Sequence, residues 1–261
     1  LGNTDGNWSG KNWQDYSTAI FRDLDGATEQ NRKTSAVTFE GDIHVDGIYV
    51  TADFTDYTFT GNGTTLMNVQ GDAPELTKNG GGTLTLNNFH DERFGTIDIN
   101  RGTVVLTDDT IEYAGDLIIA DGGTLSISSG STLTERVYRT DANGKFVLDG
   151  DGHKILVAGA VGTLAACGDG TAIYSNLTAN QGVLAGTSDT TPGRISGAAV
   201  SGYTLKDISF SGANSIQDTT VGAHVTVDCG ATLQFAGTTV FETAITNNGT
   251  LYLAAGAAVD I

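Results

Sequence analysis

The side chains that could do acid–base chemistry in this sequence are two acidic pairs and a histidine. Asp91-Glu92 and Asp108-Asp109 are adjacent acids, and His153 precedes a lysine in Gly152-His153-Lys154-Ile155. Polygalacturonase-like sites combine clustered aspartates with a histidine and an Arg-Ile-Lys element to cleave polysaccharides by general acid–base catalysis. The nearest approach to that basic element is Arg194-Ile195-Ser196. Such a site requires Asp108, Asp109 and His153 to converge in one groove.

No complete catalytic or metal-binding motif accompanies these residues. The histidines His44, His90, His153 and His224 lack the close spacing of metal ligands, and the serine nucleophile motif Gly-x-Ser-x-Gly does not occur. Asp23-Leu24-Asp25-Gly26 lacks the further ligands of an EF-hand loop. We therefore assign no catalytic residue, no metal site and no cofactor, and predict that the chain is not an enzyme.

Short strands led by glycine are the elements that must position any functional side chain. Gly82–Leu86 and Gly102–Leu106 each alternate polar and apolar residues, as half-buried strands do. Leu84, Val104 and Leu125 hold equivalent places in three such strands, and the spacing between them is almost constant. A strand repeat with a period of about 20 residues predicts a β-solenoid.

The predicted fold class is all-β: a right-handed parallel β-helix, or β-solenoid, with an irregular N-terminal cap. A sandwich would need hairpins, but the Asn-Gly pairs at 79–80, 143–144 and 248–249 each precede a strand at the repeat period, as solenoid corners do. About twelve turns at ~4.8 Å each would make a tube roughly 60 Å long. The expected inward-pointing side chains are Leu84, Val104, Leu125, Leu233 and Leu251.

The chain divides into a cap region, residues 1–35, and a parallel β-solenoid, residues 36–261, which we expect to continue beyond Ile261. Trp8 and Trp13 lie in the cap region and predict a lid over the first turn. An aromatic sugar-binding surface is the alternative interpretation of these two residues.

Regularity varies along the predicted solenoid. Strands of further turns are expected at Phe146-Val147-Leu148 and Ile155-Leu156-Val157. Between residues 158 and 202 the pattern weakens, which indicates either looser turns or a surface excursion. His90–Phe94 is expected to form a turn, and with the 158–202 region it is the predicted contact surface.

The charge balance is strongly acidic. The chain has 31 acidic and 13 basic residues and a formal net charge of −18, with no Lys or Arg after Lys206. This excludes electrostatic binding of nucleic acid and argues against binding to anionic membranes. No apolar run is long enough to span a bilayer, so we expect no direct membrane insertion. Cys167 and Cys229 are separated by about three repeats, too far for a disulfide across stacked turns, and are expected to be small buried side chains.

One stretch resembles a known repeat family. Leu76-Thr77-Lys78-Asn79-Gly80-Gly81-Gly82-Thr83-Leu84-Thr85-Leu86, followed by Asn87-Asn88-Phe89 and by Gly102–Leu106, is similar to the autotransporter-associated β-strand repeat. The family's pattern is Leu-x-Lys-x-Gly-x-Gly-x-Leu-x-Leu, an Asn and aromatic turn, then Gly-x-Leu-x-Leu. The match covers residues 76–106, and His90–Arg93 stands where the family has small residues.

The resemblance implies the passenger domain of a bacterial surface protein. We therefore expect an adhesin-like module, extracellular or on the bacterial cell surface, that acts as a rigid display and binding scaffold. Its expected partner is a host or neighbouring-cell glycan or protein, and self-association through open solenoid edges is expected as well. Its binding residues stay unassigned. The alternative is a polysaccharide-processing lyase or hydrolase on a β-helix.

Overall fold

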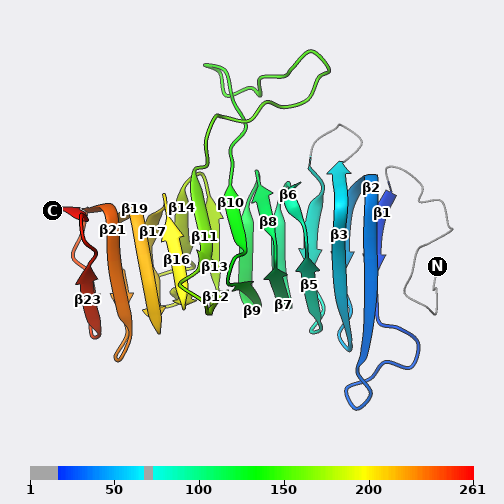
Figure 1. Cartoon of the computed structure of the whole chain (residues 1–261), viewed down its shortest axis with the longest axis horizontal. Helices are drawn as coiled ribbons and strands as arrows, with labels where there is room; N and C mark the ends of the chain where they lie inside the picture. Colours follow the sequence, from blue (N-terminus) through cyan, green and yellow to red (C-terminus); the bar gives the residue numbers. More distant parts are fainter. Residues whose placement is uncertain (1–16, 68–72) are drawn as a thin grey trace.

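The computed structural model describes residues 17–67 and 73–261, which form a β-solenoid of about 11 turns. Within these residues there is no helix, and 63% lie in strands. Figure 1 shows the turns stacked along the long axis from the N-terminal to the C-terminal end. The predicted all-β solenoid is therefore confirmed. No helix in the described part of the chain is long and apolar enough to cross a membrane.

Each turn of the tube contributes strands to three faces. In one turn, β4 (Glu75–Lys78) lies on face 1, β5 (Thr83–Asn87) on face 2 and β6 (His90–Phe94) on face 3. Because β6 is a strand paired with the next turn, the expectation of a turn or contact loop at these residues is wrong. Neighbouring turns pair in parallel, as Leu76 does with Ile97 and Ile97 with Leu117.

Long strands bend round a corner from one face to the next, so several of them belong to two faces. Face 1 also contains β1 (Ser17–Phe21), β13 (Leu177–Asn180), β14 (Val183–Gly186), β17 (Thr204–Lys206), β24 (Ala258–Asp260), the first residues of β7 (Ile97–Thr107) and β9 (Leu117–Ser128), and the last residues of β2 (Lys33–Val50), β19 (Ala213–Val221) and β21 (Thr232–Phe241). Face 2 also contains β12 (Thr171–Ser175), β15 (Gly193–Ser196), β18 (Ile208–Ser211), β20 (Thr226–Val227), β22 (Thr246–Asn247), the first residues of β2 and β3 (Thr55–Met67), and the last residues of β7 and β9. Face 3 also contains β8 (Thr110–Tyr113), β10 (Thr132–Glu135), β11 (Gly162–Ala166), β16 (Ala198–Ser201), β23 (Thr250–Leu253), and the first residues of β19 and β21.

Part of the predicted cap region belongs to the tube. β1, within residues 1–35, pairs in parallel with the end of β2 on face 1. Trp8 and Trp13, on which the lid and sugar-binding interpretations depend, lie outside the described residues.

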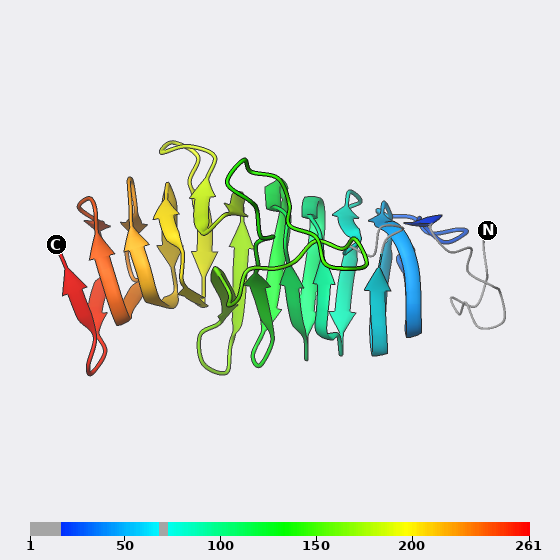
Figure 2. The ribbon, with the colours of Figure 1, turned by 90° about the horizontal axis from the view of Figure 1, so that it is seen from above.

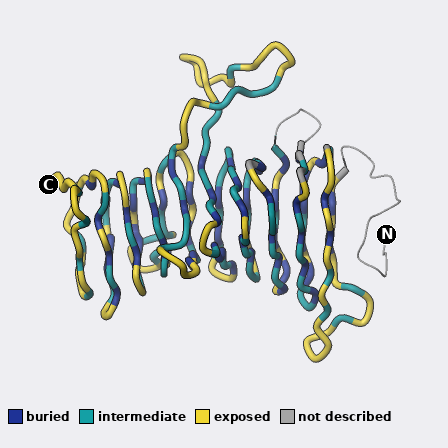
Figure 3. The backbone as a smooth tube through the Cα atoms, in the orientation of Figure 1, coloured by how far each residue is buried: buried dark blue, intermediate teal, exposed yellow. Residues whose placement is uncertain are grey.

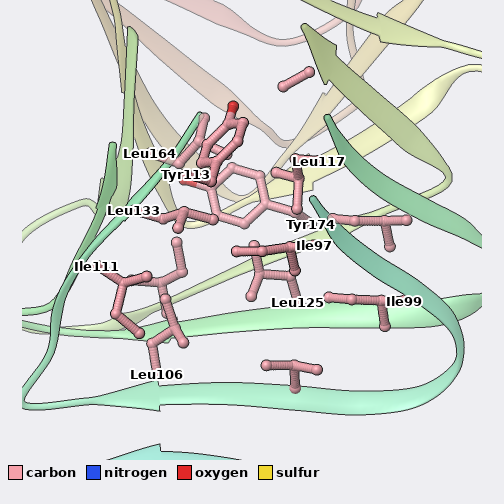
Figure 4. Packing of buried hydrophobic residues seen from close by; sticks show 14 of the residues in the cluster. Ile97, Ile99, Leu106, Ile111, Tyr113, Leu117, Leu125, Leu133, Leu164 and Tyr174 are labelled. Carbon is pink, nitrogen blue, oxygen red and sulfur yellow. The ribbon is translucent and has the colours of Figure 1, made fainter. Parts of the chain in front are cut away.

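Apolar side chains fill the tube. Burial alternates along the strands, as in β5, whose leucines are buried and whose threonines are half-buried. Figure 4 shows how closely apolar side chains pack around Leu125. Fully burying one such side chain stabilises the fold by about 1.5–3 kcal/mol. Four of the predicted inward residues are confirmed, because each is at most 1% exposed: Leu84, Val104, Leu125 and Leu233. The fifth, Leu251, lies in the last turn, where it is half-buried and packs against the core.

One turn runs in the opposite direction to all the others. β11, β12 and β13 are antiparallel to β10 and β9 before them, and to β16, β15 and β14 after them. The prediction of parallel pairing is wrong for this turn, because side-chain alternation predicts a strand but not its direction. Residues 162–201 thus form two turns of the tube, so of the two expectations for this region the surface excursion is wrong.

Corner glycines allow neighbouring turns to approach closely. A Cβ added at Gly80 would lie 2.1 Å from the carbonyl oxygen of Ala52. We expect Gly80→Ala to lower the free energy of unfolding by about 1–3 kcal/mol, because the backbone must shift to relieve this clash. Gly150→Ala is the control, since a Cβ there meets no atom within 4 Å. Chemical denaturation followed by circular dichroism measures both variants, and equal stability would contradict the close approach.

Candidate functional site

Residues 136–161 leave the tube between β10 and β11, and we call this segment the arm. Figures 1 and 2 show that it projects from the stacked turns and folds into loops of its own. The strands expected at 146–148 and 155–157 lie in the arm, so the prediction that they belong to the tube is wrong. Their backbone groups bond within the arm.

The outer part of the arm, residues 137–157, consists of three similar segments, and we call it the knob. The N–H of Arg139 donates to the carbonyl of Ile155 (2.7 Å), Val147 to Arg139 (2.8 Å) and Ile155 to Val147 (3.0 Å). These three residues are evenly spaced in the sequence, and their bonds close a ring. Each segment therefore supports the other two through their backbone groups.

Aspartates fix the turns between the knob segments. Oδ1 of Asp141 accepts the backbone N–H groups of Asn143 and Lys145, and Oδ1 of Asp149 accepts those of Asp151 and His153. Asp and Asn side chains commonly stabilise turns in this way. The hydrogen bond from the His153 backbone lowers the pKa of Asp149. Both carboxylates thus serve the local structure.

Apolar side chains gather on the knob without being buried. The rings of Tyr138 and Phe146 meet edge to face, with centroids 5.8 Å apart, and the Lys154 ammonium lies 5.1 and 4.8 Å from the two ring centroids. Phe146 is 47% exposed and Leu148 is 50% exposed. Figure 3 shows the arm as mostly exposed, in contrast to the buried strands of the tube.

Charged side chains attach the arm to face 3. Nη1 of Arg136 lies 2.8 Å from Oε1 of Glu112, and Oε2 of the same carboxylate lies 3.4 Å from Nε of Arg93. Nη2 of Arg136 also donates to the carbonyl of Val157 (3.5 Å), on the returning segment of the arm. The N–H of Val161 donates to the Glu135 carbonyl (2.9 Å). The two ends of the arm are therefore held together where they meet the tube.

A buried carboxylate lies directly below the arm. Oε1 of Glu135 accepts the N–H of Gly182 (3.1 Å), and Tyr113 donates its hydroxyl to Oε2 (3.4 Å). The hydroxyls of Tyr113 and Tyr203 are 2.9 Å apart. Burial raises the pKa of Glu135 and of both tyrosines. Glu135 and Gly182 lie where the chain reverses direction, so this network fixes both reversals.

The predicted catalytic candidates do not come together. Asp109 is 1% exposed, and its two oxygens accept the N–H groups of Phe89 (2.7 Å) and Thr107 (2.8 Å); burial raises its pKa to about 6. Asp109 lies just before β8, at the start of face 3. His153 belongs to the knob, and the arm that carries the knob leaves the tube after β10, at the other end of face 3. Asp108 is exposed at a corner with φ 56°. These residues therefore share no groove.

The other candidate residues have structural surroundings. Glu92 is buried, and its Oε1 accepts the N–H groups of Leu66 and Arg93 (both 3.1 Å). Arg194 is exposed on face 2. Cys167 and Cys229 are free thiols, half-buried and exposed respectively, so the expectation of buried side chains is wrong. No cluster of three or more His, Cys, Asp or Glu within residues 17–67 and 73–261 could hold a metal ion.

One polar pair was missed in the sequence. Nδ1 of His224 lies 2.8 Å from Oδ1 of the nearly buried Asp207, at the corner between faces 1 and 2. A carboxylate that orients a histidine is part of many acid–base sites, but no nucleophile accompanies this pair among the described residues. The two residues are separated by one turn of the local repeat, and that spacing was the available signal.

The arm is the feature of the described chain that departs most clearly from a regular tube. Exposed apolar side chains, a self-supporting knob and a firmly attached base distinguish it from the corners elsewhere. Comparison with protein-family models, with curated proteins and with solved structures finds no match for this chain.

Proposed function

We propose that the chain is an adhesin-like binding module, similar to a bacterial autotransporter passenger, whose stiff tube displays the arm to a glycan or protein. Its place would be outside the cell or on the bacterial surface. The repeat-like sequence at residues 76–106 and the solenoid fold support this proposal. Self-association through solenoid edges remains a prediction.

The observation that carries the proposal is the exposed apolar surface of the knob. Apolar groups exposed together on a protein surface usually mark a contact site, because leaving them in water costs free energy. Here Phe146 and Leu148 stand on a segment that the tube does not need for its own pairing. A stiff scaffold with a projecting contact element is the arrangement that display requires.

The test compares the intact chain with a variant that lacks the arm. β10 and β11 already pair antiparallel up to Glu135 and Gly162, so replacing residues 137–160 with Asn-Gly should close a short hairpin. On an array of glycans and matrix proteins, we expect the intact chain to bind at least one ligand and the shortened chain to lose it. Unchanged binding by the shortened chain would refute display through the arm.

The alternative, a polysaccharide lyase or hydrolase, is favoured only by the His224–Asp207 pair. It predicts new reducing ends when the chain is incubated with polysaccharides, and loss of that activity in His224→Ala. The same array ligands can serve as substrates, so both functions are compared on one set of glycans. Release that depends on His224 would favour the enzyme over the display module.

A further inference from the structure

The charge of the arm differs from that of the tube. The arm holds four of the chain's 13 lysines and arginines but only three of its 31 acidic residues. The one positive charge in excess is that of Arg136, at the base of the arm, and the knob itself has three cations and three carboxylates. The knob is therefore neutral on a chain with net charge −18, so it does not repel anions as the remaining surface does.

Two cations of the knob are not used by the fold. Arg136 bonds to Glu112, and Lys154 lies over the aromatic rings. By contrast, Arg139 and Lys145 are exposed, and neither side chain forms a hydrogen bond or ion pair with the described part of the chain. Both sit in the hairpin in which Arg139 pairs with Val147 and Asp141 with Lys145. Arg139 and Lys145 are therefore diagonal neighbours on the two strands of this hairpin, and their side chains point to the same side of it.

We propose that the knob binds an anionic polysaccharide, with Arg139 and Lys145 contacting its carboxylate or sulfate groups. This rests on the proposed display function and names its ligand class. Guanidinium and ammonium groups donate strong hydrogen bonds to such anions.

The size of the knob favours a carbohydrate over a protein. A stable protein interface takes about 20–30 residues from each side. The whole knob, residues 137–157, barely reaches the lower end of that range, and only part of it can face one partner.

Projection of the arm fits an anionic ligand as well. At physiological ionic strength, charges more than about 8 Å apart are largely screened from each other. A ligand held at the end of the arm, away from the stacked turns in Figure 1, can therefore contact Arg139 and Lys145 while it is little affected by the acidic tube. The same ligand laid along a face would meet the tube's carboxylates.

The experiment measures binding of the full chain to polygalacturonate, dextran sulfate and neutral dextran by biolayer interferometry. We expect binding to at least one anionic polymer and not to dextran, and about tenfold weaker binding by Arg139→Ala/Lys145→Ala. The matched control, Arg194→Ala/Lys206→Ala, removes the same charge from exposed positions on the tube and should bind as the original chain does. Preference for polygalacturonate or dextran sulfate distinguishes carboxylate from sulfate recognition.

Several outcomes would overturn the inference. Equal losses in the two double variants would show a general charge effect, and binding to dextran alone would exclude anion recognition. Arg139→Lys/Lys145→Arg should restore binding, and failure to do so while the melting temperature is unchanged would count against simple charge contacts. If no anionic polymer binds but shortening the arm still removes an array ligand, display stands and this ligand class is wrong.

Discussion

Glu135→Ala should lower the free energy of unfolding by about 2–4 kcal/mol, the largest loss we expect from truncating one polar side chain. The change leaves the N–H of Gly182 and the hydroxyl of Tyr113 without their carboxylate acceptor in a buried place. Each unsatisfied buried group costs about 1–3 kcal/mol, and the space vacated by the carboxylate adds to that cost. Chemical denaturation at neutral pH measures the loss.

Two further variants show whether the loss comes from the network. Glu135→Gln keeps a carbonyl oxygen that can accept the Gly182 N–H, so it should lose less than half as much stability. Glu242→Ala removes an exposed carboxylate of the C-terminal turns and should change stability by less than about 0.5 kcal/mol. If the alanine and glutamine variants at position 135 are equally stable, the hydrogen bond to Gly182 does not hold the reversal in place.

The periodic part of the fold was predictable because its signal is local. Leu84 and Val104 stand in strands whose own residues alternate between polar and apolar, and their spacing equals one turn. Their inward direction therefore followed from the sequence. The direction of β11–β13 was not predictable, since antiparallel and parallel neighbours bury the same alternating side chains. The two reversals are linked by a hydrogen bond between Glu135 and Gly182, which are distant in the sequence.

The arm was missed for a different reason. Its short repeat relates Tyr138, Phe146 and Lys154, and it is visible in the sequence. The runs at 146–148 and 155–157 nevertheless have the composition of tube strands, so composition alone does not separate them from the strands of a turn. Looser turns or an excursion were expected at 158–202, which lies beyond most of the arm. A change of period within a solenoid can therefore mark an element that leaves the tube.

Lys78 shows how a residue of the repeat pattern acts in the fold. It is fully buried, and its ammonium donates to the carbonyls of Gly80 and, at 3.3 Å, Arg101 at the corner between faces 1 and 2. Burial lowers its pKa from 10.5 to about 8, although Asp53 and Asp56 act in the opposite direction. The lysine in the Leu-x-Lys pattern thus bonds to backbone carbonyl groups at the corner.

This lowered pKa predicts a rise in stability at alkaline pH. Between about pH 8 and 10.5, the unfolded chain holds a proton that the folded chain has released, so the free energy of unfolding increases with pH in this window. From about pH 8 to about pH 10 the contribution amounts to about 2 kcal/mol. Lys78→Met removes it, and the difference between the two stability curves isolates it from tyrosine ionisation. The curve of stability against pH for Lys206→Met, a change at an exposed position, should run parallel to that of the original chain. A constant difference between the original chain and Lys78→Met across this range would show that Lys78 is not perturbed by burial.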